Sequence, residues 1–291
     1  MNSRLKTGVD GLDPLLGGGL VPGTLTVVVG ASGIGKTQLG LQFCDQGRRQ
    51  EGHRGIIFDM SARIDSQGHA PYAKRMFDWA LENCPLATFS AEGFFDANRP
   101  RGDYLRVFDE QGRRVTQRDL GFDAWHDWQA ILAAKLELTI DFLYGNFVRG
   151  RRRVVIDGLE PVERPSESIQ FELLEYIYHQ VLRKDSAWVA RDLFRQLYRA
   201  HAESIERHAY DYRQLGAMLL STSHETMLDA LIERPLVDGD VSAAANTLIY
   251  MGKIRDNGKL SRGLLIAKHR GSACSDEIIR YTIDDRGIRL D

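Results

Sequence analysis

The eight residues that decide the fold run Gly30-Ala31-Ser32-Gly33-Ile34-Gly35-Lys36-Thr37. They match the pattern G-x-x-x-x-G-K-[ST] in full. An apolar, β-branched run at residues 25–29 precedes them, and Leu39 and Phe43 follow with the four-residue spacing of one helical face. A strand, a glycine-rich turn and a helix in this order let several backbone N–H groups face one anion at the positive end of the helix. The sequence therefore predicts a phosphate-binding loop here, with a chance glycine-rich turn as the alternative.

Two side chains of this loop and one carboxylate further along have expected roles. Lys36 is expected to reach the β- and γ-phosphates of a nucleotide, and Thr37 to give its hydroxyl to Mg²⁺. Asp157 ends the apolar run at residues 154–156, so a strand there would place its carboxylate beside the same ion. An apolar run that ends in Asp is often no more than a strand end, but its place downstream of the loop favours the metal role. The predicted ligand is ATP with magnesium.

The remaining apolar runs predict the architecture. Short runs at residues 55–58, 217–220 and 247–251 read as strands, and residues 128–147 and 169–182 have helical patterns. Strands that alternate with helices predict an α/β fold, with a mostly parallel central sheet covered by helices on both faces.

Two segments are expected to be insertions into a single domain that spans residues 1–291. The first, at about residues 85–126, is irregular, and its runs at 104–108 and 113–116 suggest a hairpin. The second, at about residues 186–213, is charged and helical in pattern. In it we expect one apolar packing stripe, formed by Trp188, Leu193, Leu197 and Tyr198.

Composition narrows the function further. The chain has 291 residues, 38 basic against 40 acidic, and a formal net charge of −2, so no global positive field would attract nucleic acid. Its three cysteines form no CxxC pair, which suits a reducing compartment. The polar N-terminal residues and the lack of a run of about 20 apolar residues predict a cytoplasmic protein with no membrane partner.

Flanking motifs resemble a known family. The stretches Thr7-Gly8-Val9-Asp10-Gly11-Leu12-Asp13 and Gly17-Gly18-Gly19-Leu20-Val21-Pro22-Gly23 resemble the entry to RecA-superfamily ATPases of the KaiC and RadA type. Near the other end, Leu260-Ser261-Arg262-Gly263 and Lys268-His269-Arg270-Gly271-Ser272 resemble the KaiC signature S-R-x…K-x-R-G-[ST], and residues 278–288 resemble its closing strand. The resemblance covers about residues 1–65, 128–162 and 215–291. It implies a RecA-like fold with a short antiparallel extension at the C-terminal end.

The resemblance also implies a site shared between subunits. In KaiC-like rings the Lys and Arg of K-x-R-G project towards the ATP of the neighbouring subunit, and Lys268 and Arg270 hold those positions here. It therefore implies a homo-oligomer, either a ring or a filament, with ATP at the subunit boundaries. From the residues alone, a solvated basic strand edge is the favoured interpretation of both side chains, and the resemblance favours the shared site instead. Ser221-Thr222-Ser223 corresponds to a polar sensor near the γ-phosphate, or to hydroxyls that cap a strand end.

One departure concerns hydrolysis. Relatives carry a glutamate after the second strand that activates the attacking water, but Ser61 and Ala62 stand at that position. Asp59, Asp65 and Glu160 are the alternative bases. We therefore expect nucleotide binding with slow hydrolysis.

Basic and acidic runs bear on DNA. The run Arg149-Gly150-Arg151-Arg152-Arg153 is expected to be a solvated turn between a helix and a strand. In DNA-binding relatives, the loops after the third and fourth strands grip nucleic acid; here the second, at residues 225–240, holds five acidic side chains against one basic, which disfavours DNA. Three functions stay open: a KaiC-like ATPase, a nucleotide-gated regulatory scaffold that binds a protein partner with negligible turnover, and a RadA-like recombination or repair factor.

Overall fold

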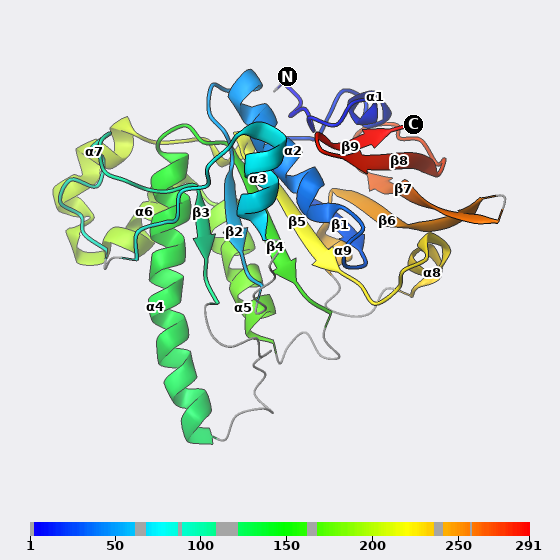
Figure 1. Ribbon diagram of the computed structural model, residues 1–291. Coiled ribbons are helices and arrows are strands. Elements are labelled where there is room, and N and C mark those ends of the chain that lie inside the picture. The colour runs from blue at the N-terminus through cyan, green and yellow to red at the C-terminus, as the bar shows by residue number, and fades with distance from the viewer. Residues whose placement is uncertain are drawn as a thin grey trace.

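The computed structural model describes residues 3–61, 68–86, 89–108, 122–161, 168–235, 241–256 and 258–291, with side chains of the long helix described from residue 133 onwards. Within these residues nine strands form one sheet (Figure 1). The strands are β1 (Thr24–Gly30), β2 (Ile56–Asp59), β3 (Tyr104–Arg106), β4 (Arg153–Leu159), β5 (Gly216–Thr222), β6 (Thr247–Asp256), β7 (Lys259–His269), β8 (Ile279–Asp284) and β9 (Gly287–Leu290). The helices are α1 (Leu12–Leu15), α2 (Lys36–Gln50), α3 (His69–Phe77), α4 (Phe122–Phe147), α5 (Ile169–Tyr176), the π-helix η2 (Ile177–Leu182), α6 (Ser186–Phe194), the short 3₁₀ turns η3 (Arg195–Leu197) and η4 (Arg199–His201), α7 (Ala202–Arg207), η5 (Tyr212–Gln214), α8 (Leu228–Glu233) and α9 (Val241–Ala244).

The strand order is β3-β2-β4-β5-β1-β6-β7-β8-β9. The six strands from β3 to β6 run parallel, whereas β7, β8 and β9 each pair antiparallel with the strand before. This arrangement confirms the predicted α/β, RecA-like sheet with an antiparallel C-terminal extension. In Figure 1 the extension lies at the right of the sheet and the helical segment α6–α7 at the left.

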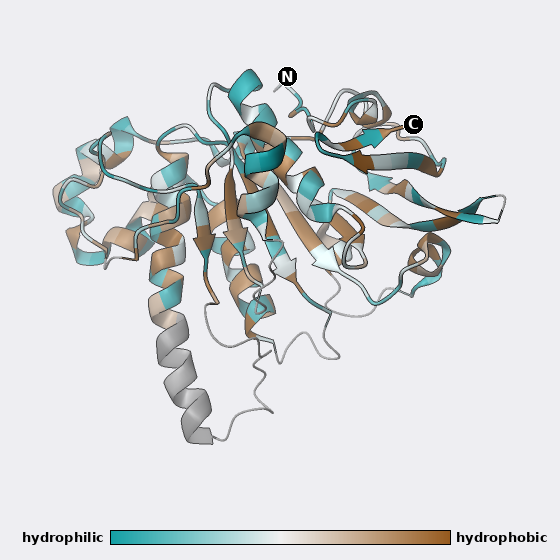
Figure 2. Ribbon diagram, viewed as in Figure 1, coloured by the Kyte–Doolittle hydropathy of each residue, from teal (hydrophilic) through white to brown (hydrophobic). Residues whose placement is uncertain are grey.

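Both faces of the central strands are buried. Val27 and Val29 of β1 belong to a core shared with α4, α5 and α6, while Val28 between them belongs to a second core shared with α2 and α3. Successive side chains of a strand point to opposite faces, so a continuous apolar run is required wherever both faces are covered. Figure 2 shows these apolar strands at the centre of the molecule.

The two expected insertions differ from the prediction. Residues 104–106 are not one arm of a hairpin: as β3 they pair parallel with β2 and form the edge of the main sheet. The other predicted arm, at 113–116, lies outside the described residues. In the second insertion the prediction of one apolar packing stripe is wrong. Leu193 is buried, whereas Trp188 and Leu197 are 51% and 49% exposed.

The basic run before β4 is also only partly a solvated turn. Arg153 is fully buried, and its Nε lies 2.7 Å from Glu51 Oε2 at the C-terminal end of α2. The same guanidinium donates to the backbone carbonyls of Lys6 and Phe43. Arg153 thus joins the start of β4 to α2 through a paired and hydrogen-bonded charge, as burial of a charge requires. Among the helices described, none has a stretch both long and apolar enough to cross a membrane.

Candidate nucleotide site

The glycine-rich loop joins the carboxyl end of β1 to the first residue of α2. Gly33 and Gly35 have φ values of 76° and 113°, in the left-handed region that favours glycine. A Cβ on Gly30 would lie 2.4 Å from the carbonyl oxygen of Met251, so only glycine fits there. The structure therefore brings all eight predicted loop residues together at the N-terminus of a 15-residue helix, where backbone N–H groups favour an anion.

Lys36 lies inside this loop. Its side-chain nitrogen donates to the carbonyl oxygens of Gly30 at 2.8 Å and Ala31 at 2.9 Å, and the residue is 7% exposed. Burial lowers the pKa of the Lys36 ammonium to about 8, although the negative charge of Asp157 acts in the opposite direction. A cation with a weakened hold on its proton therefore stands in the middle of the loop.

Thr37 and Asp157 meet across the site. Asp157 lies at the carboxyl end of β4, next to β2, and its Oδ2 accepts a hydrogen bond of 2.9 Å from the Thr37 hydroxyl. Burial acts to raise the pKa of Asp157, but hydrogen bonds and charges from His69, Thr37 and Lys36 outweigh it and hold that pKa below its usual range. A hydroxyl and an ionised carboxylate are the oxygen donors that Mg²⁺ accepts alongside nucleotide phosphates and water. The residues present therefore fit that ion.

Sequence reasoning missed two members of the site, His69 and Tyr104. His69 is the first residue of α3, and its Nε2 lies 2.9 Å from Asp157 Oδ2. The Tyr104 hydroxyl, from β3, donates to Asp59 Oδ2 at 2.5 Å, and the rings of His69 and Tyr104 lie 5.5 Å apart. Neither residue belongs to a motif. The only signal was indirect: Asp59 and Asp157 each follow a predicted strand, and the structure shows that these strands are neighbours.

Ser61, which stands at the position of the expected glutamate, packs its backbone against Gly158. Gly158 has a φ of 88°, and a Cβ there would lie 2.3 Å from the Ser61 nitrogen. Ser61 N donates to Asp59 Oδ1 at 2.8 Å, so both Asp59 oxygens already accept hydrogen bonds. Ala62 and Asp65 lie outside the described residues, and Glu160 is half-buried just beyond β4.

The predicted sensor segment reaches the loop. Thr222 pairs with Gly30 in the sheet, and Ser223 N donates to the Gly30 carbonyl at 3.0 Å. The Ser223 hydroxyl donates to the Glu225 carboxylate, which lowers the pKa of Glu225. The hydroxyl thus caps its own strand end while lying beside the phosphate-binding loop. The DNA-contacting loops of relatives correspond to segments that include residues 162–167 and 236–240, which lie outside the described residues.

The structure does not bring Lys268 and Arg270 to the loop of their own chain. Gly30 aligns with Met251 of β6, and Met251 pairs with Leu264 of β7, five residues before His269. Lys268 pairs with Leu248, three residues from Met251, and Arg270 bonds to Asn246, five residues from it. At about 3.3 Å per residue, Lys268 lies roughly 10 Å and Arg270 roughly 15 Å from Met251 along the sheet. There the Lys268 ammonium donates to the Ala243 carbonyl at 3.2 Å, and Arg270 is exposed. Burial, followed by the charge of Arg270, lowers the pKa of Lys268.

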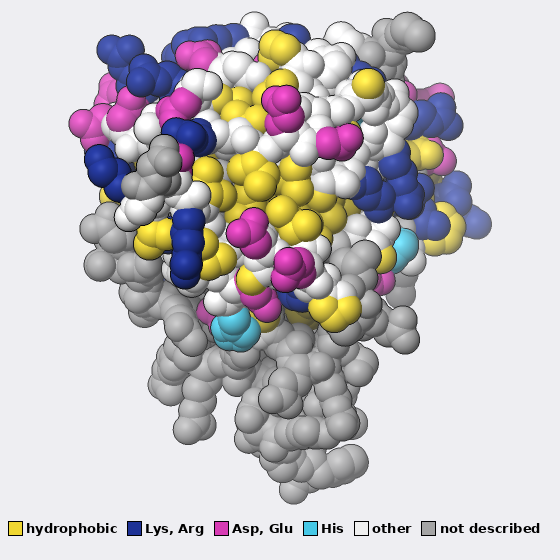
Figure 3. All heavy atoms as spheres, turned by 90° about the vertical axis from the view of Figure 1, so that its right-hand side faces the viewer, with side chains coloured by type: hydrophobic (Ala, Val, Ile, Leu, Met, Phe, Trp, Pro, Cys, Tyr) yellow, Lys and Arg dark blue, Asp and Glu magenta, His cyan; other side chains and the backbone are white. Residues whose placement is uncertain are grey.

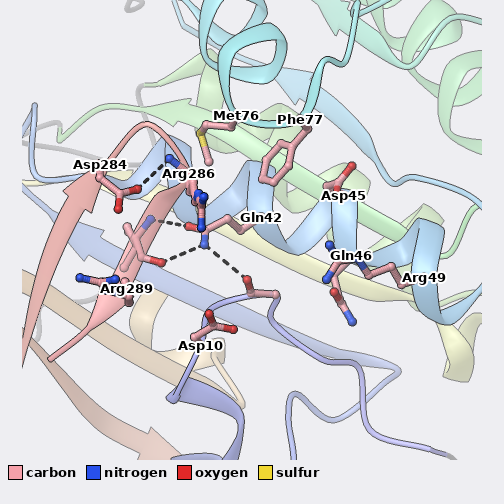
Figure 4. Close-up of a pocket in the computed structure, with 12 residues that line it drawn as sticks. Asp10, Gln42, Asp45, Gln46, Arg49, Met76, Phe77, Asp284, Arg286 and Arg289 are labelled. Atoms are coloured by element: carbon pink, nitrogen blue, oxygen red, sulfur yellow. Dashed lines mark hydrogen bonds between the residues drawn. The ribbon is translucent and has the colours of Figure 1, made fainter.

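A cavity of about 610 Å³ lies along the other side of α2 (Figure 4). Gln42 crosses its floor: the side-chain amide donates to the Ile288 carbonyl at 2.9 Å and accepts from the Ile288 nitrogen at 2.8 Å. Charged side chains of both signs surround it, namely Asp10, Asp45, Arg49, Asp284, Arg286 and Arg289. None of the eight loop residues lines this cavity, so it is separate from the phosphate-binding loop.

Comparisons with known proteins agree with the N-terminal part of this site. The family model of the KaiC ATPase matches residues 5–83. The circadian clock oscillator protein KaiC of Rippkaea orientalis is 33% identical over 81 residues, and that of Picosynechococcus is 40% identical over 81 residues; each alignment covers 28% of this chain and 14% of the relative. The circadian clock protein KaiC2 of Synechocystis is 37% identical over 81 residues, which are 27% of this chain and 14% of the relative.

The matched residues include the phosphate-binding loop and His69, whereas Tyr104, Asp157, Lys268 and Arg270 lie beyond them. The aligned segment is a small part of these relatives, so it identifies a domain type and not a whole protein. Over residues 5–83 this chain is similar to the KaiC ATPase domain, and the strand order of the sheet is consistent with a RecA-like fold.

Proposed function

We propose that this protein binds ATP with magnesium at the loop of residues 30–37 and hydrolyses it slowly. The observation that carries the proposal is the 2.9 Å hydrogen bond between Thr37 and Asp157, which joins the loop to the end of β4 from 120 residues away. With the buried Lys36 ammonium beside it, a cation, a hydroxyl and a carboxylate converge where the helix presents its N–H groups.

The chemistry of binding follows from these groups. The Lys36 ammonium donates hydrogen bonds to the carbonyl oxygens of Gly30 and Ala31, and phosphate oxygens would compete for the same donor. Thr37 and Asp157 would hold the magnesium ion, which would supply positive charge to the β- and γ-phosphates. Gly33 and Gly35 leave the backbone free of side chains, so that a phosphate can approach closely.

The proposal includes assembly with nucleotide at subunit boundaries. Lys268 and Arg270 are displaced along the sheet from the loop of their own chain, which supports a role for them at the nucleotide of another copy. Figure 3 shows that apolar side chains gather on the face formed by the antiparallel extension, with acidic and basic groups around them. Ile232, Leu260 and Ile278, on or beside the elements of that side, are partly exposed, which favours contact with a second copy.

A regulatory scaffold with negligible turnover is the second candidate. It is favoured by Ser61 at the position of the activating glutamate and by Asp59, whose two oxygens are already engaged. Such a protein would respond to ATP by changing its assembly. The single sheet supports one domain in either case.

The test is mass measurement in solution without nucleotide, with ADP and with a non-hydrolysable ATP analogue, run beside a phosphate-release assay. We expect larger assemblies with the ATP analogue and slow release of phosphate. An unchanged mass in all three states, with bound nucleotide demonstrated, contradicts assembly at the nucleotide. Negligible turnover with a change of mass selects the scaffold.

A further inference from the structure

Two carboxylates lie side by side near the carboxyl ends of the adjacent strands β2 and β4, and one imidazole contacts both. Asp59 and Asp157 occupy the same register position on the adjacent strands β2 and β4, and both are buried. Like charges at this spacing repel each other, and burial strengthens the repulsion. The ring of His69 reaches both: Nε2 lies 2.9 Å from Asp157 Oδ2, and Nδ1 lies 3.6 Å from Asp59 Oδ2.

Most hydrogen-bond acceptor sites of the Asp157 carboxylate are already occupied. Its Oδ2 accepts from Thr37 and is contacted by His69, while its Oδ1 accepts from the Gly158 nitrogen at 2.7 Å. An ionised carboxylate has about four lone-pair sites, two on each oxygen. Oδ2, the oxygen that faces Thr37, therefore already has two partners, and one of them must withdraw before a magnesium ion or a water of its shell can approach it.

Thr37 need not be the partner that withdraws. A hydroxyl has one proton to donate and two lone pairs, so Thr37 can keep its bond to Asp157 while its oxygen binds a metal ion. His69 cannot bind the ion in the same way, because its Nε2 is engaged by Asp157 and has no further lone pair to offer. The imidazole is also well held: it is 8% exposed, begins α3 and packs against Tyr104, which is itself bonded to Asp59.

We propose that His69 is a positioning residue that occupies Asp157 in the nucleotide-free protein and competes with the hydrated magnesium ion for that carboxylate. The proposal rests on the nucleotide site proposed above. In this account the imidazole keeps two neighbouring carboxylates compatible with folding while no metal is bound. Its hold on Asp157 reduces the advantage that magnesium gives to nucleotide binding.

The experiment measures the dissociation constant of a fluorescent, non-hydrolysable ATP analogue, first with excess Mg²⁺ and then with a chelator. The quantity compared is the dissociation constant with the chelator divided by the dissociation constant with Mg²⁺, which measures how much magnesium strengthens binding. In His69→Ala we expect this ratio to rise by roughly tenfold over the wild type, the usual effect of one hydrogen bond to a charged group. His69→Gln keeps a donor of similar reach, so its ratio should stay nearer the wild type.

Two further variants keep the test decisive. His179→Ala makes the same substitution at an exposed histidine on η2 and should leave the ratio unchanged. If the single variant His69→Ala fails to fold, the double variant Asp59→Asn with His69→Ala takes its place, because Asp59→Asn removes the repulsion between the two carboxylates. The reference for the double variant is then Asp59→Asn alone.

The two proposals fail in different ways. A ratio in His69→Ala within twofold of the wild type, or below it, overturns the role of His69 while ATP binding that depends on Lys36 leaves the site itself intact. No binding to the wild type, or binding that Lys36→Ala leaves unchanged, overturns the nucleotide site and the role of His69 with it.

Discussion

Thr37 and Asp157, 120 residues apart in the chain, are joined by a hydrogen bond of 2.9 Å from hydroxyl to carboxylate. This contact ties the start of α2 to the end of β4. It is the point at which a magnesium ion would meet both protein oxygens.

Asp157→Asn is expected to weaken ATP binding in the presence of magnesium more than in its absence. The amide keeps the size of the side chain but removes the charge that attracts the ion. Calorimetric titrations with excess Mg²⁺ and with a chelator measure both effects. Equal losses under the two conditions would mean that Asp157 is only a strand end.

Much of the fold was predictable because its signals are local. The loop of residues 30–37 and the apolar runs of β1, β4 and β5 each contain their own evidence. The placement of β3 was not predictable, because three residues of a short strand do not indicate their partner. Arg153 misled for a related reason: its partner, Glu51, lies on another element.

The same distinction applies to the site. Lys36 and Thr37 come from a motif, and Asp157 from a strand end, whereas His69 and Tyr104 reach the site only through pairing of β2 with β3 and β4. No spacing in the sequence encodes that meeting. The roles proposed for the loop, for Asp157 and for the cations Lys268 and Arg270 therefore stay predictions.

The low pKa of Lys36 predicts that ATP binding takes up a proton in alkaline solution. With a pKa of about 8 in the free protein, Lys36 is mostly charged at pH 7 and mostly neutral at pH 9. Bound phosphate favours the charged form and raises this pKa, so affinity should fall as pH rises above 8. Magnesium-free calorimetry at pH 9, in two buffers of different ionisation enthalpy, measures the uptake.

Lys36→Arg is the control for this prediction, because a guanidinium stays charged throughout this pH range. We expect uptake approaching one proton in the wild type and little in the variant. The same uptake in both proteins would assign the proton to another group.

Arg270→Ala is expected to leave nucleotide binding by the monomer nearly unchanged and to weaken ATP-induced assembly or turnover. The reason is its distance of roughly 15 Å along the sheet from the loop of its own chain. Mixing it with Lys36→Ala protein should partly restore activity, since a mixed boundary can pair an intact loop with an intact Arg270. No recovery, in a mixture shown to co-assemble, argues against a site completed by the neighbour.

Hydrolysis by the wild type is expected to be slow, well under about 1 per second, the low end of common enzyme turnover. Ser61 offers no proton acceptor at neutral pH, and a general base typically contributes about 10²–10⁴-fold in rate. Ser61→Glu should raise turnover, because the Ser61 backbone packs against Gly158 and so lies next to Asp157. Steady-state phosphate release measures both proteins.

Three carboxylate-to-amide variants, Asp59→Asn, Asp65→Asn and Glu160→Gln, complete that experiment. Fast release by the wild type that collapses in one of them would identify the true base and overturn the expectation of slow hydrolysis. For Asp59→Asn we expect no such collapse, because both oxygens of Asp59 already accept hydrogen bonds.

The most direct test of the central claim is the affinity for ATP of Lys36→Ala against that of the wild type, measured by calorimetry with magnesium. Lys74→Ala, at an exposed lysine on α3, is the matched control. A charge-assisted contact is worth about 1.5–3 kcal/mol, so Lys36→Ala should bind ATP roughly tenfold or more weakly while Lys74→Ala binds as the wild type does. Unchanged affinity in a folded Lys36→Ala protein would contradict a nucleotide site at this loop.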